Sequence, residues 1–368
     1  MKPTKKKVIR LAAACVAAGL LICLIALTAL DFNYFELATM EPVTNTYAVT
    51  EHFTDIVVRG AECDVRLLPS EDGACTVLCN ETDRITHHVA VENRTLVIHR
   101  TDNRKWYEHI GFMWQYWGPI EVIVYLPDRA YETLELRTAS GDIDVPHDFS
   151  FARADADTSS GSIHWTAEVQ GNLSLRSVSG GIAAGGTGAE TLSLHSTSGN
   201  IAVDSVKVNG AFSCQTVSGR LKINDMTCQS ATIYATSGDV TVDALKANTE
   251  FSCKAISGKQ DISRVACQSA VINATSGSVT LSDLIASETL HMEAVSGDLK
   301  LIDCDAAALW LKTVSGSIMG TLRTEKVFDT HTTSGSIRVP NTVTGGTCEA
   351  RTVSGAINLE LSDKEPAP

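Results

Sequence analysis

Two neighbouring stretches of the sequence decide the fold. They read Thr191-Leu-Ser-Leu-His-Ser-Thr-Ser-Gly-Asn-Ile-Ala-Val-Asp204 and, 20 residues further on, Ala211-Phe-Ser-Cys-Gln-Thr-Val-Ser-Gly-Arg-Leu-Lys-Ile-Asn224. In both, apolar and polar residues alternate with the period of two that is typical of a β-strand. The alternation shifts by one residue after the Ser-Gly pair, so we interpret the pair as a corner. Glycine suits a corner because it adopts positive φ angles at little cost.

The Ser-Gly pair recurs at a regular spacing of 19 or 20 residues. Its twelve serines are Ser140, Ser160, Ser179, Ser198, Ser218, Ser237, Ser257, Ser276, Ser296, Ser315, Ser334 and Ser354. A fixed period of this size is typical of a solenoid, in which each repeat forms one coil. Because the repeats have a strand period, we predict an all-β protein: a single-stranded parallel β-helix with about twelve regular coils.

The polar residues before each corner are predicted to point inward. This interpretation places Ser196 and Ser198 in the interior, where the hydroxyl groups of successive coils would stack as a hydrogen-bonded ladder. Gln260 stands where other coils have an apolar residue. We therefore expect a local distortion at the corner that contains Gly258.

Residues 45–137 contain strand-like segments without the regular spacing. We interpret them as irregular first coils and an N-terminal β cap, because a solenoid needs a cap over its open core. The regular repeats occupy residues 138–361, and a disordered tail is predicted at 362–368. The other predicted segments are a basic tail at 1–10, an apolar segment at 11–30 and a linker at 31–44.

The apolar segment is long enough to cross a membrane as a helix. Leu11 to Leu30 carries no charge, and a helix of that length spans about 30 Å. Five basic residues precede it, which predicts a single-pass signal anchor with a cytoplasmic N-terminus and an extracytoplasmic β-helix. A cleaved signal peptide is the alternative, although such peptides have a shorter apolar region and end in small residues.

The composition bounds the function. The formal net charge is −13, with 30 Lys and Arg against 43 Asp and Glu, and 44% of the residues are hydrophobic. That hydrophobic content can support a folded core, and the acidic balance argues against binding to nucleic acid.

One family has the same succession of segments. Phe53-Thr-Asp-Ile-Val-Val-Arg-Gly60, Cys63-Asp-Val-Arg-Leu-Leu-Pro69, Val122-Ile-Val-Tyr-Leu-Pro127 and Leu134-Glu-Leu-Arg-Thr-Ala-Ser-Gly141 follow the apolar segment in that order. The sequence thereby resembles the bacterial "putative adhesin" domain of unknown function over roughly residues 45–361. The resemblance implies a membrane-anchored or envelope-associated β-helix, and it supplies no catalytic residues.

The common enzyme motifs are absent from the sequence. It contains no His-Glu-x-x-His, Walker A, Gly-x-Ser-x-Gly or EF-hand loop. Residues 180–188 are rich in glycine, but strand-like residues follow them, so a phosphate-binding loop does not fit the context. We predict a protein that is not an enzyme and has no cofactor or bound metal.

The cysteines give little support to a disulfide framework. The ectodomain has an odd number of cysteines, and Cys214 and Cys253 would lie two coils apart, about 9.6 Å. This separation exceeds the limit of about 7 Å for a bridge. We predict that the repeat cysteines are buried thiols, while a pair among Cys63, Cys75 and Cys79 stays open.

Two sets of residues are candidate sites. An acidic ladder follows the second strand of several coils, and we interpret it either as side chains that hydrogen-bond the corner backbone or as a row that binds cations or a basic partner. Its members are Asp204, Asp225, Asp243, Asp283 and Asp303.

The second set is an aromatic loop at residues 106–117. It is interpreted as a lid on the coil end, a glycan or partner surface, or a loop at the lipid interface. The aromatic residues are Trp106, Tyr107, Phe112, Trp114, Tyr116 and Trp117.

The leading hypothesis is a non-catalytic, membrane-tethered envelope protein that acts as an adhesin or binding scaffold. Its partner would be an envelope glycan or a membrane protein. An accessory protein of an envelope-stress system is the first alternative. A β-helix polysaccharide lyase or glycosidase is the second, which rests on analogy of fold alone.

Overall fold

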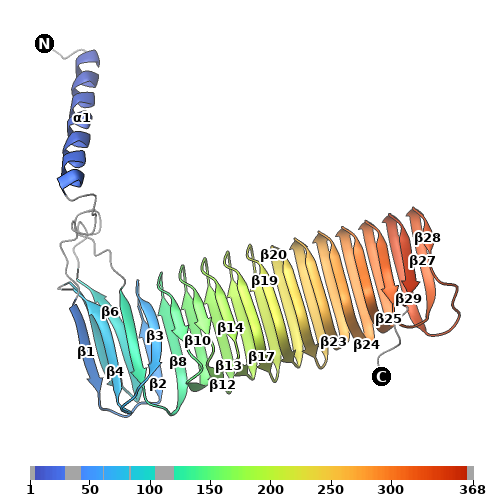
Figure 1. The fold of residues 1–368 in the computed structure, drawn as a ribbon, viewed down its shortest axis with the longest axis horizontal. Helices are drawn as coiled ribbons and strands as arrows, with labels where there is room; N and C mark the ends of the chain where they lie inside the picture. Colours follow the sequence, from blue (N-terminus) through green and yellow to red (C-terminus); the bar gives the residue numbers. More distant parts are fainter. Residues whose placement is uncertain (1–4, 30–42, 61, 83, 104–119, 363–368) are drawn as a thin grey trace.

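The computed structural model describes residues 5–29, 43–60, 62–82, 84–103 and 120–362. The described residues from 43 onward form a rod of stacked β-strands, with β1 (Val43–Val49) at one end and β27 (Lys326–Ser334) and β28 (Ile337–Arg338) at the other (Figure 1). Neighbouring strands along the repeats pair in parallel. The predicted all-β solenoid is therefore confirmed.

The N-terminal segment forms helix α1 (Lys5–Ala29). The helix begins at Lys5, so its first turns include basic residues that the sequence analysis assigned to a separate tail. Within the residues that the structure describes, we find no helix that is both long and apolar enough to pass through a membrane. The transmembrane helix predicted at 11–30 is therefore not supported.

Each regular coil has a strand that leads into the Ser-Gly corner and a strand that leaves it. The strands that lead in form what we call the entry sheet, and those that leave form the exit sheet. The entry sheet comprises β8 (Ala130–Thr138), β10 (Ser150–Thr158), β13 (Asn172–Ser177), β16 (Thr191–Ser196), β18 (Ala211–Thr216), β20 (Ser230–Ser237), β22 (Glu250–Ser257), the later parts of β23 (Gln260–Ser276), β24 (Val279–Ser296) and β25 (Leu299–Ser315), then β29 (Gly346–Ser354) and β27.

The exit sheet lies on the opposite side of the corner. It comprises β9 (Ile143–Val145), β11 (Ile163–Trp165), β14 (Ile182–Gly185), β17 (Ile201–Val208), β19 (Leu221–Cys228), β21 (Val240–Ala247), the first parts of β23 to β25, β26 (Ile318–Leu322), β30 (Ile357–Leu361) and β28. Short strands β12 (Glu168–Val169) and β15 (Gly188–Ala189) complete two coils. The alternating residues predicted to be apolar and inward, such as Leu192 and Leu194, are buried.

The first strands extend both sheets toward the N-terminal end. On the entry side, β2 (Asp55–Arg59) pairs in parallel with β8 and with β6 (Thr95–Asp102), and β5 (Ile85–Glu92) pairs antiparallel with β6. On the exit side, β3 (Asp64–Pro69) pairs in parallel with β9 and with β7 (Glu121–Leu126). Strand β4 (Cys75–Glu81) then pairs antiparallel with β7 and with β1. The outermost strand on each side is thus antiparallel to its neighbour.

The corner glycines stack directly on one another. A Cβ atom added to any of the twelve would lie between 1.7 and 2.4 Å from a backbone carbonyl oxygen of the adjacent coil. In Gly161, Gly180 and Gly199 that oxygen belongs to the preceding corner glycine. Glycine is required here chiefly because the backbones approach closely, and only some corners, such as Gly258 with φ of 133°, also have a positive φ. From the sequence, glycine was expected at the corner only because of its φ angle.

In the first coils, a buried hydroxyl group forms hydrogen bonds at the corner. Thr158 Oγ1 accepts a hydrogen bond from the Gly161 amide at 3.1 Å and donates to the carbonyl of Gly141 in the adjacent coil at 3.2 Å. Ser196 occupies the same position and accepts from the Gly199 amide at 2.8 Å. The predicted inward hydroxyl is therefore confirmed at this position.

Two details of the predicted ladder are wrong. The serine of each Ser-Gly pair, including Ser198, is exposed, because the glycine alone occupies the interior side of the corner. The hydroxyl row is also interrupted where alanine replaces serine or threonine, as at Ala255 and Ala274. At these corners the glycine amide donates to a serine carbonyl in the next coil instead, as Gly258 does to Ser276.

The expected distortion at Gln260 does not occur. Gln260 is fully buried and keeps the regular register between Val240 and Val279. Its side-chain Nε2 donates to the carbonyl of Asn273 at 2.8 Å. The side chain thus takes an apolar position without displacing the strand, and its nitrogen has a partner, although its buried Oε1 has none among the described residues.

The last coils do not stack in the order of the sequence. Strand β29 lies between β25 and β27 (Figure 1). Strand β30 pairs with β26 on one side and with β28 on the other. The inward residues of the inserted C-terminal coil, such as Cys348 and Leu359, are apolar and buried. The outer coil has the polar residues Thr330 and Thr332 on its inward side. The coil whose inward side chains lose less free energy when they are exposed to solvent therefore lies at the end of the rod.

The stacking of the corner glycines predicts that alanine substitutions at two adjacent glycines differ in their effect on stability. Gly180→Ala should lower the free energy of unfolding by about 2 kcal/mol or more, because its Cβ would lie 1.8 Å from the Gly161 oxygen. Gly181→Ala is the matched control, since its nearest neighbour would lie at 3.5 Å. Denaturant unfolding measures both, and equal destabilisation of the two variants would contradict the steric explanation.

The inserted coil predicts an inversion of amide protection. Strand β29 has a paired neighbour on each side, whereas β27 lies at the edge of the sheet. Hydrogen exchange read by mass spectrometry should therefore be slower in residues 346–354 than in 326–334, although the former lie nearer the C-terminus. Faster exchange in 346–354 would indicate that the coils stack in sequence order.

Candidate functional site

The aromatic loop predicted as the recognition site lies outside the described residues. This applies to the whole set of Trp106, Tyr107, Phe112, Trp114, Tyr116 and Trp117. Its role stays a prediction.

The five aspartates do not form a single ladder. Asp204 and Asp243 belong to one row, in which Asn224 lies between them. Asp225, Asp283 and Asp303 lie one residue later in their coils and have positive φ angles of 47°, 53° and 53°. Aspartate tolerates this conformation better than most residues because its short polar side chain can hydrogen-bond locally.

Side chains of the rod itself hold several of these carboxylates. Arg264 Nε donates to Asp243 Oδ1 at 2.8 Å, and Arg323 Nη2 donates to Asp283 Oδ1 at 2.7 Å. Hydrogen bonds from Arg264 and then from Ser263 lower the pKa of Asp243 to about 2. The arrangement favours a structural role at the corner over an open row for cations.

The pKa of Asp243 predicts an acid-dependent contribution to stability. A lowered folded-state pKa gives stability that is present above the unfolded pKa of about 3.9 and is lost as the pH falls toward about 2. Asp243→Asn should therefore flatten the fall in melting temperature between pH 4 and 2. The effect should be small because the side chain is 35% exposed. Asp261→Asn, exposed on β23, is the control, and coincident profiles for Asp243→Asn and the wild type would contradict the prediction.

The rod cysteines are buried and unpaired. Cys214 and Cys253 lie on either side of Ile233 in the stack, which confirms that they are two coils apart. Burial raises the pKa of the Cys253 thiol to about 12. No disulfide is present in the described part of the chain, and the free thiols of the rod are Cys63, Cys75, Cys79, Cys214, Cys228, Cys253, Cys267, Cys304 and Cys348.

One line of outward residues on the entry sheet is mainly basic. We call it the outer row, and it contains the residue three positions before each corner serine together with its counterparts on the N-terminal strands. From the N-terminal end it runs His88, His99, Arg59, Arg137, Asp157, Arg176, His195, Gln215, Tyr234, Lys254, Asn273, Glu293, Lys312, Arg351 and His331.

The charge of the outer row is opposite to that of the whole protein. It has six Lys or Arg residues and only two acidic ones, Asp157 and Glu293, while the full chain has a net charge of −13. The neighbouring line, two residues earlier in each strand, is uncharged in the middle coils, from Ser174 to Ser252. Arg176 and Lys254 are exposed and therefore face solvent on a polar, hydroxyl-rich surface.

A tryptophan lies on the same face as the basic row. Trp310 is 38% exposed and lies between His291 and Glu349 in the entry sheet. Lys312 is two residues further along the same strand, so both side chains point outward. An exposed indole can stack on a flat ligand, while the ammonium group of Lys312 beside it forms an ion pair with Glu293 at 2.8 Å.

A shallow hollow lies at the N-terminal end of the outer row. It has a volume of about 590 Å³ and is lined in part by Arg59, Arg100 and Arg137. Glu135 forms ion pairs with Arg59 at 3.2 Å and Arg137 at 3.1 Å. The Arg100 side chain is 3% exposed, and its Nε and Nη2 atoms have no hydrogen-bond partner among the described residues, although Nη2 lies 3.6 Å from an Asp102 carboxylate oxygen. Arg100 Nη1 also donates to Glu62 at 3.4 Å, so the buried guanidinium is paired with carboxylates of the protein itself.

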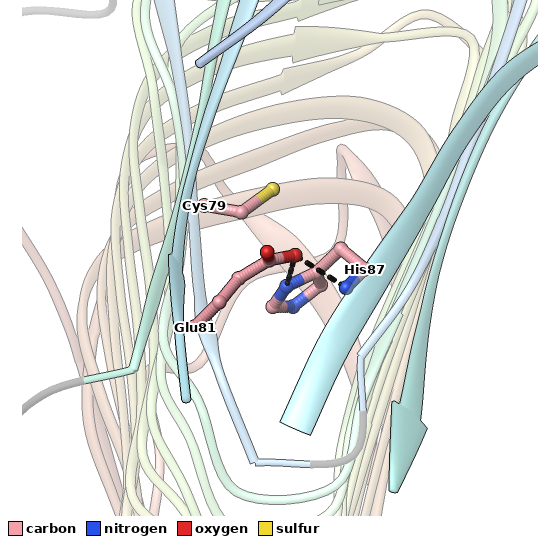
Figure 2. A group of neighbouring side chains, drawn as sticks. All are labelled: Cys79, Glu81 and His87. Carbon is pink, nitrogen blue, oxygen red and sulfur yellow. Dashed lines mark hydrogen bonds and ion pairs between the residues drawn. The ribbon is translucent and has the colours of Figure 1, made fainter. Parts of the chain in front are cut away.

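A second cluster lies inside the N-terminal end, where the sequence analysis predicted no metal or other site. Figure 2 shows that Cys79 and Glu81 come from one strand and His87 from another. Cys79 and Glu81 are two residues apart on β4 and so point to the same side. One ligand atom from each residue lies within 4.8 Å of the others, and all three residues are buried. The sequence signal is the Cys-x-Glu spacing just before a turn.

Hydrogen bonds set the charge of the cluster. Glu81 Oε1 lies 3.1 Å from His87 Nδ1 and accepts from the Tyr47 hydroxyl at 3.0 Å, and Asn45 donates to Oε2. Burial by itself raises the pKa of Glu81, but these hydrogen bonds outweigh it and lower that pKa. Burial lowers the pKa of His87 and raises that of Cys79 to about 12. The cluster thus contains a carboxylate, a neutral imidazole and a thiol.

The fold and its surface define a class of protein: a β-solenoid whose repeats display continuous rows of side chains. The chain belongs to the Toastrack family DUF4097, whose model matches residues 53–263 and 243–367. This membership agrees with the resemblance to a domain of unknown function that the sequence indicated.

Three solved structures are similar to this chain at low identity. A protein from Parabacteroides merdae described as a putative adhesin is 13% identical, with 77% of this chain and 97% of that chain covered and a TM-score of 0.40. A putative lipid binding protein from Parabacteroides distasonis is 17% identical, with coverage of 77% and 95% and a TM-score of 0.34. A putative adhesin from Bacteroides fragilis is 15% identical, with coverage of 87% and 97% and a TM-score of 0.30. Among curated proteins there is no match.

Proposed function

We propose that this protein is a non-catalytic binding scaffold that presents the outer row of its entry sheet to an anionic polysaccharide. The observation that carries the proposal is the basic outer row on a protein whose net charge is −13. An extracytoplasmic, envelope-associated location, which the family resemblance implies, belongs to the same proposal.

Electrostatics supports this choice of face. A polymer of acidic sugars is repelled by the acidic surface of the rod, and it is attracted to a row of guanidinium and ammonium groups. Arg and Lys form charge-assisted hydrogen bonds with carboxylate, sulfate or phosphate groups, which are about twice as strong as neutral ones. Lys254 has no carboxylate beside it in the outer row or on the adjacent line, whereas Arg176 lies next to Asp157 in the outer row.

The shape of the face also suits a linear polymer. Successive coils place one outer-row residue about every 4.8 Å, so a ligand that lies along the rod meets a repeated set of contacts. Trp310 adds an apolar platform, and exposed aromatic residues are prominent among the groups that dominate binding energy. The hollow lined in part by Arg59 and Arg137 lies at one end of the row.

Binding of polygalacturonate to the purified full-length chain tests the proposal. The double variant Arg176→Gln with Lys254→Gln should weaken binding at least tenfold, since removing a hydrogen bond to a charged group costs about 1.5 kcal/mol or more. Its melting temperature should be unchanged because both side chains are exposed. Titration calorimetry at two salt concentrations should also show weaker binding at high salt.

The matched control is Lys222→Gln with Lys300→Gln, which removes the same charge from exposed positions on the exit sheet. This variant should bind polygalacturonate like the wild type. Neutral dextran should bind no better to the wild type than to the outer-row variant. Equal losses in both double variants, or no binding by the wild type, would refute the proposed face.

A further inference from the structure

We propose that Cys79, Glu81 and His87 bind one divalent transition-metal ion of the zinc type at the N-terminal end of the rod. The proposal does not depend on the polysaccharide face. It rests on three observations: the chemistry of the three side chains, their geometry, and the hydrogen bonds that orient the Glu81 carboxylate.

The chemistry of the cluster is that of a zinc site. Cysteine sulfur, histidine nitrogen and carboxylate oxygen are the three kinds of protein atom that bind zinc. All three kinds are present here, one from each residue, and all three residues are buried. Hard cations such as calcium and magnesium prefer oxygen ligands, so the thiol favours zinc or a similar transition metal over them.

The geometry is close to that of a coordinated ion. With metal–ligand bonds of about 2.0 to 2.3 Å, two ligand atoms on a tetrahedral ion lie about 3.3 to 3.6 Å apart. Glu81 Oε1 and His87 Nδ1 lie 3.1 Å apart, and all three ligand atoms lie within 4.8 Å of one another. In Figure 2 the carboxylate lies between the sulfur and the imidazole ring. A shift of about 1 Å in the Cys79 side chain is enough to bring the three atoms around one ion.

Neighbouring groups hold the carboxylate in place. Asn45 and Tyr47, both on β1, donate hydrogen bonds to Glu81 from outside the cluster. Metal ligands are commonly oriented in this way by a second layer of hydrogen bonds. His87 Nε2 is buried and has no hydrogen-bond partner among the described residues. The ring nitrogen that lies beside Glu81 is Nδ1, so Nδ1 rather than Nε2 is the ligand atom of the proposed site.

The position of the site suggests what the ion does. Strand β4 pairs with β1 and β7 on the exit side, whereas β5 pairs with β6 on the entry side. An ion bound by Cys79, Glu81 and His87 therefore cross-links the two sheets at the end of the rod. A solenoid end has no further coil to hold its sheets together, so a metal bridge supplies the missing connection.

Metal uptake by the purified full-length chain tests the site. After dialysis against chelator, the wild type should take up one zinc per chain in competition with a chromogenic chelator. Cobalt should give the near-ultraviolet absorption band of a thiolate ligand. Cys79→Ser should abolish that band, and His87→Gln should weaken zinc binding at least tenfold.

Two controls separate this site from adventitious binding. Cys214→Ser removes a buried thiol elsewhere in the rod, and His88→Gln removes an exposed imidazole next to His87. Both variants should keep one zinc and the cobalt band. A band that survives Cys79→Ser, or is lost in Cys214→Ser, would overturn the assignment.

A measurement on the wild type covers the case in which a ligand variant does not fold. A ligand that binds only the folded state stabilises it by mass action, so zinc at 100 times its dissociation constant should raise the folded-to-unfolded ratio about 100-fold. The melting temperature should rise accordingly over that in excess chelator. No uptake of metal by the wild type and no change in its melting temperature would refute the proposal.

Discussion

The rod depends on the close approach of one glycine backbone to the next at every corner. A carbonyl oxygen occupies the space in which a Cβ atom would lie, at 1.8 Å for Gly161, Gly180 and Gly199. This contact sets where the chain can turn, and the strands before and after the corner then pair in parallel with those of the adjacent coil. The hydrogen bonds around the corner can vary, as the exchange between Ser196 and Ala255 shows, but the glycine does not.

Because the corner is the same in every coil, residues at the same position of successive repeats lie in one row along the rod. The residue three positions before the serine becomes the outer row, whereas the position with positive φ places Asp225 and Arg264 in a different row. Charges that are scattered in the sequence are thereby sorted in space. The acidic residues at the corner are balanced by arginines such as Arg264 and Arg323, and a basic line lies along the entry sheet.

The two ends of the rod break the regular pattern, and buried charged or titratable groups occur there. At the N-terminal end, antiparallel strands enclose Glu81 and His87. At the C-terminal end, Lys326 is 2% exposed and forms an ion pair with Asp305 at 2.7 Å. A regular coil buries its interior between two neighbours, but an end coil has only one. Polar groups with specific partners complete the ends because further apolar stacking is not available.

The sequence by itself determined the solenoid, because a period of 19 or 20 residues with a strand pattern and a fixed Ser-Gly corner is a local property of the chain. It also determined that Cys214 and Cys253 lie two coils apart. Only the tertiary structure decided which coil lies at the C-terminal end. The coil with the Gly335 corner and the coil with the Gly355 corner both fit the same edge of the rod. Their order depends on which coil has inward side chains that lose less free energy when they are exposed to solvent. The tertiary structure also decided the cluster of Cys79, Glu81 and His87. The spacing of Cys79 and Glu81 along one strand cannot show which side chain of the opposite sheet lies beside them.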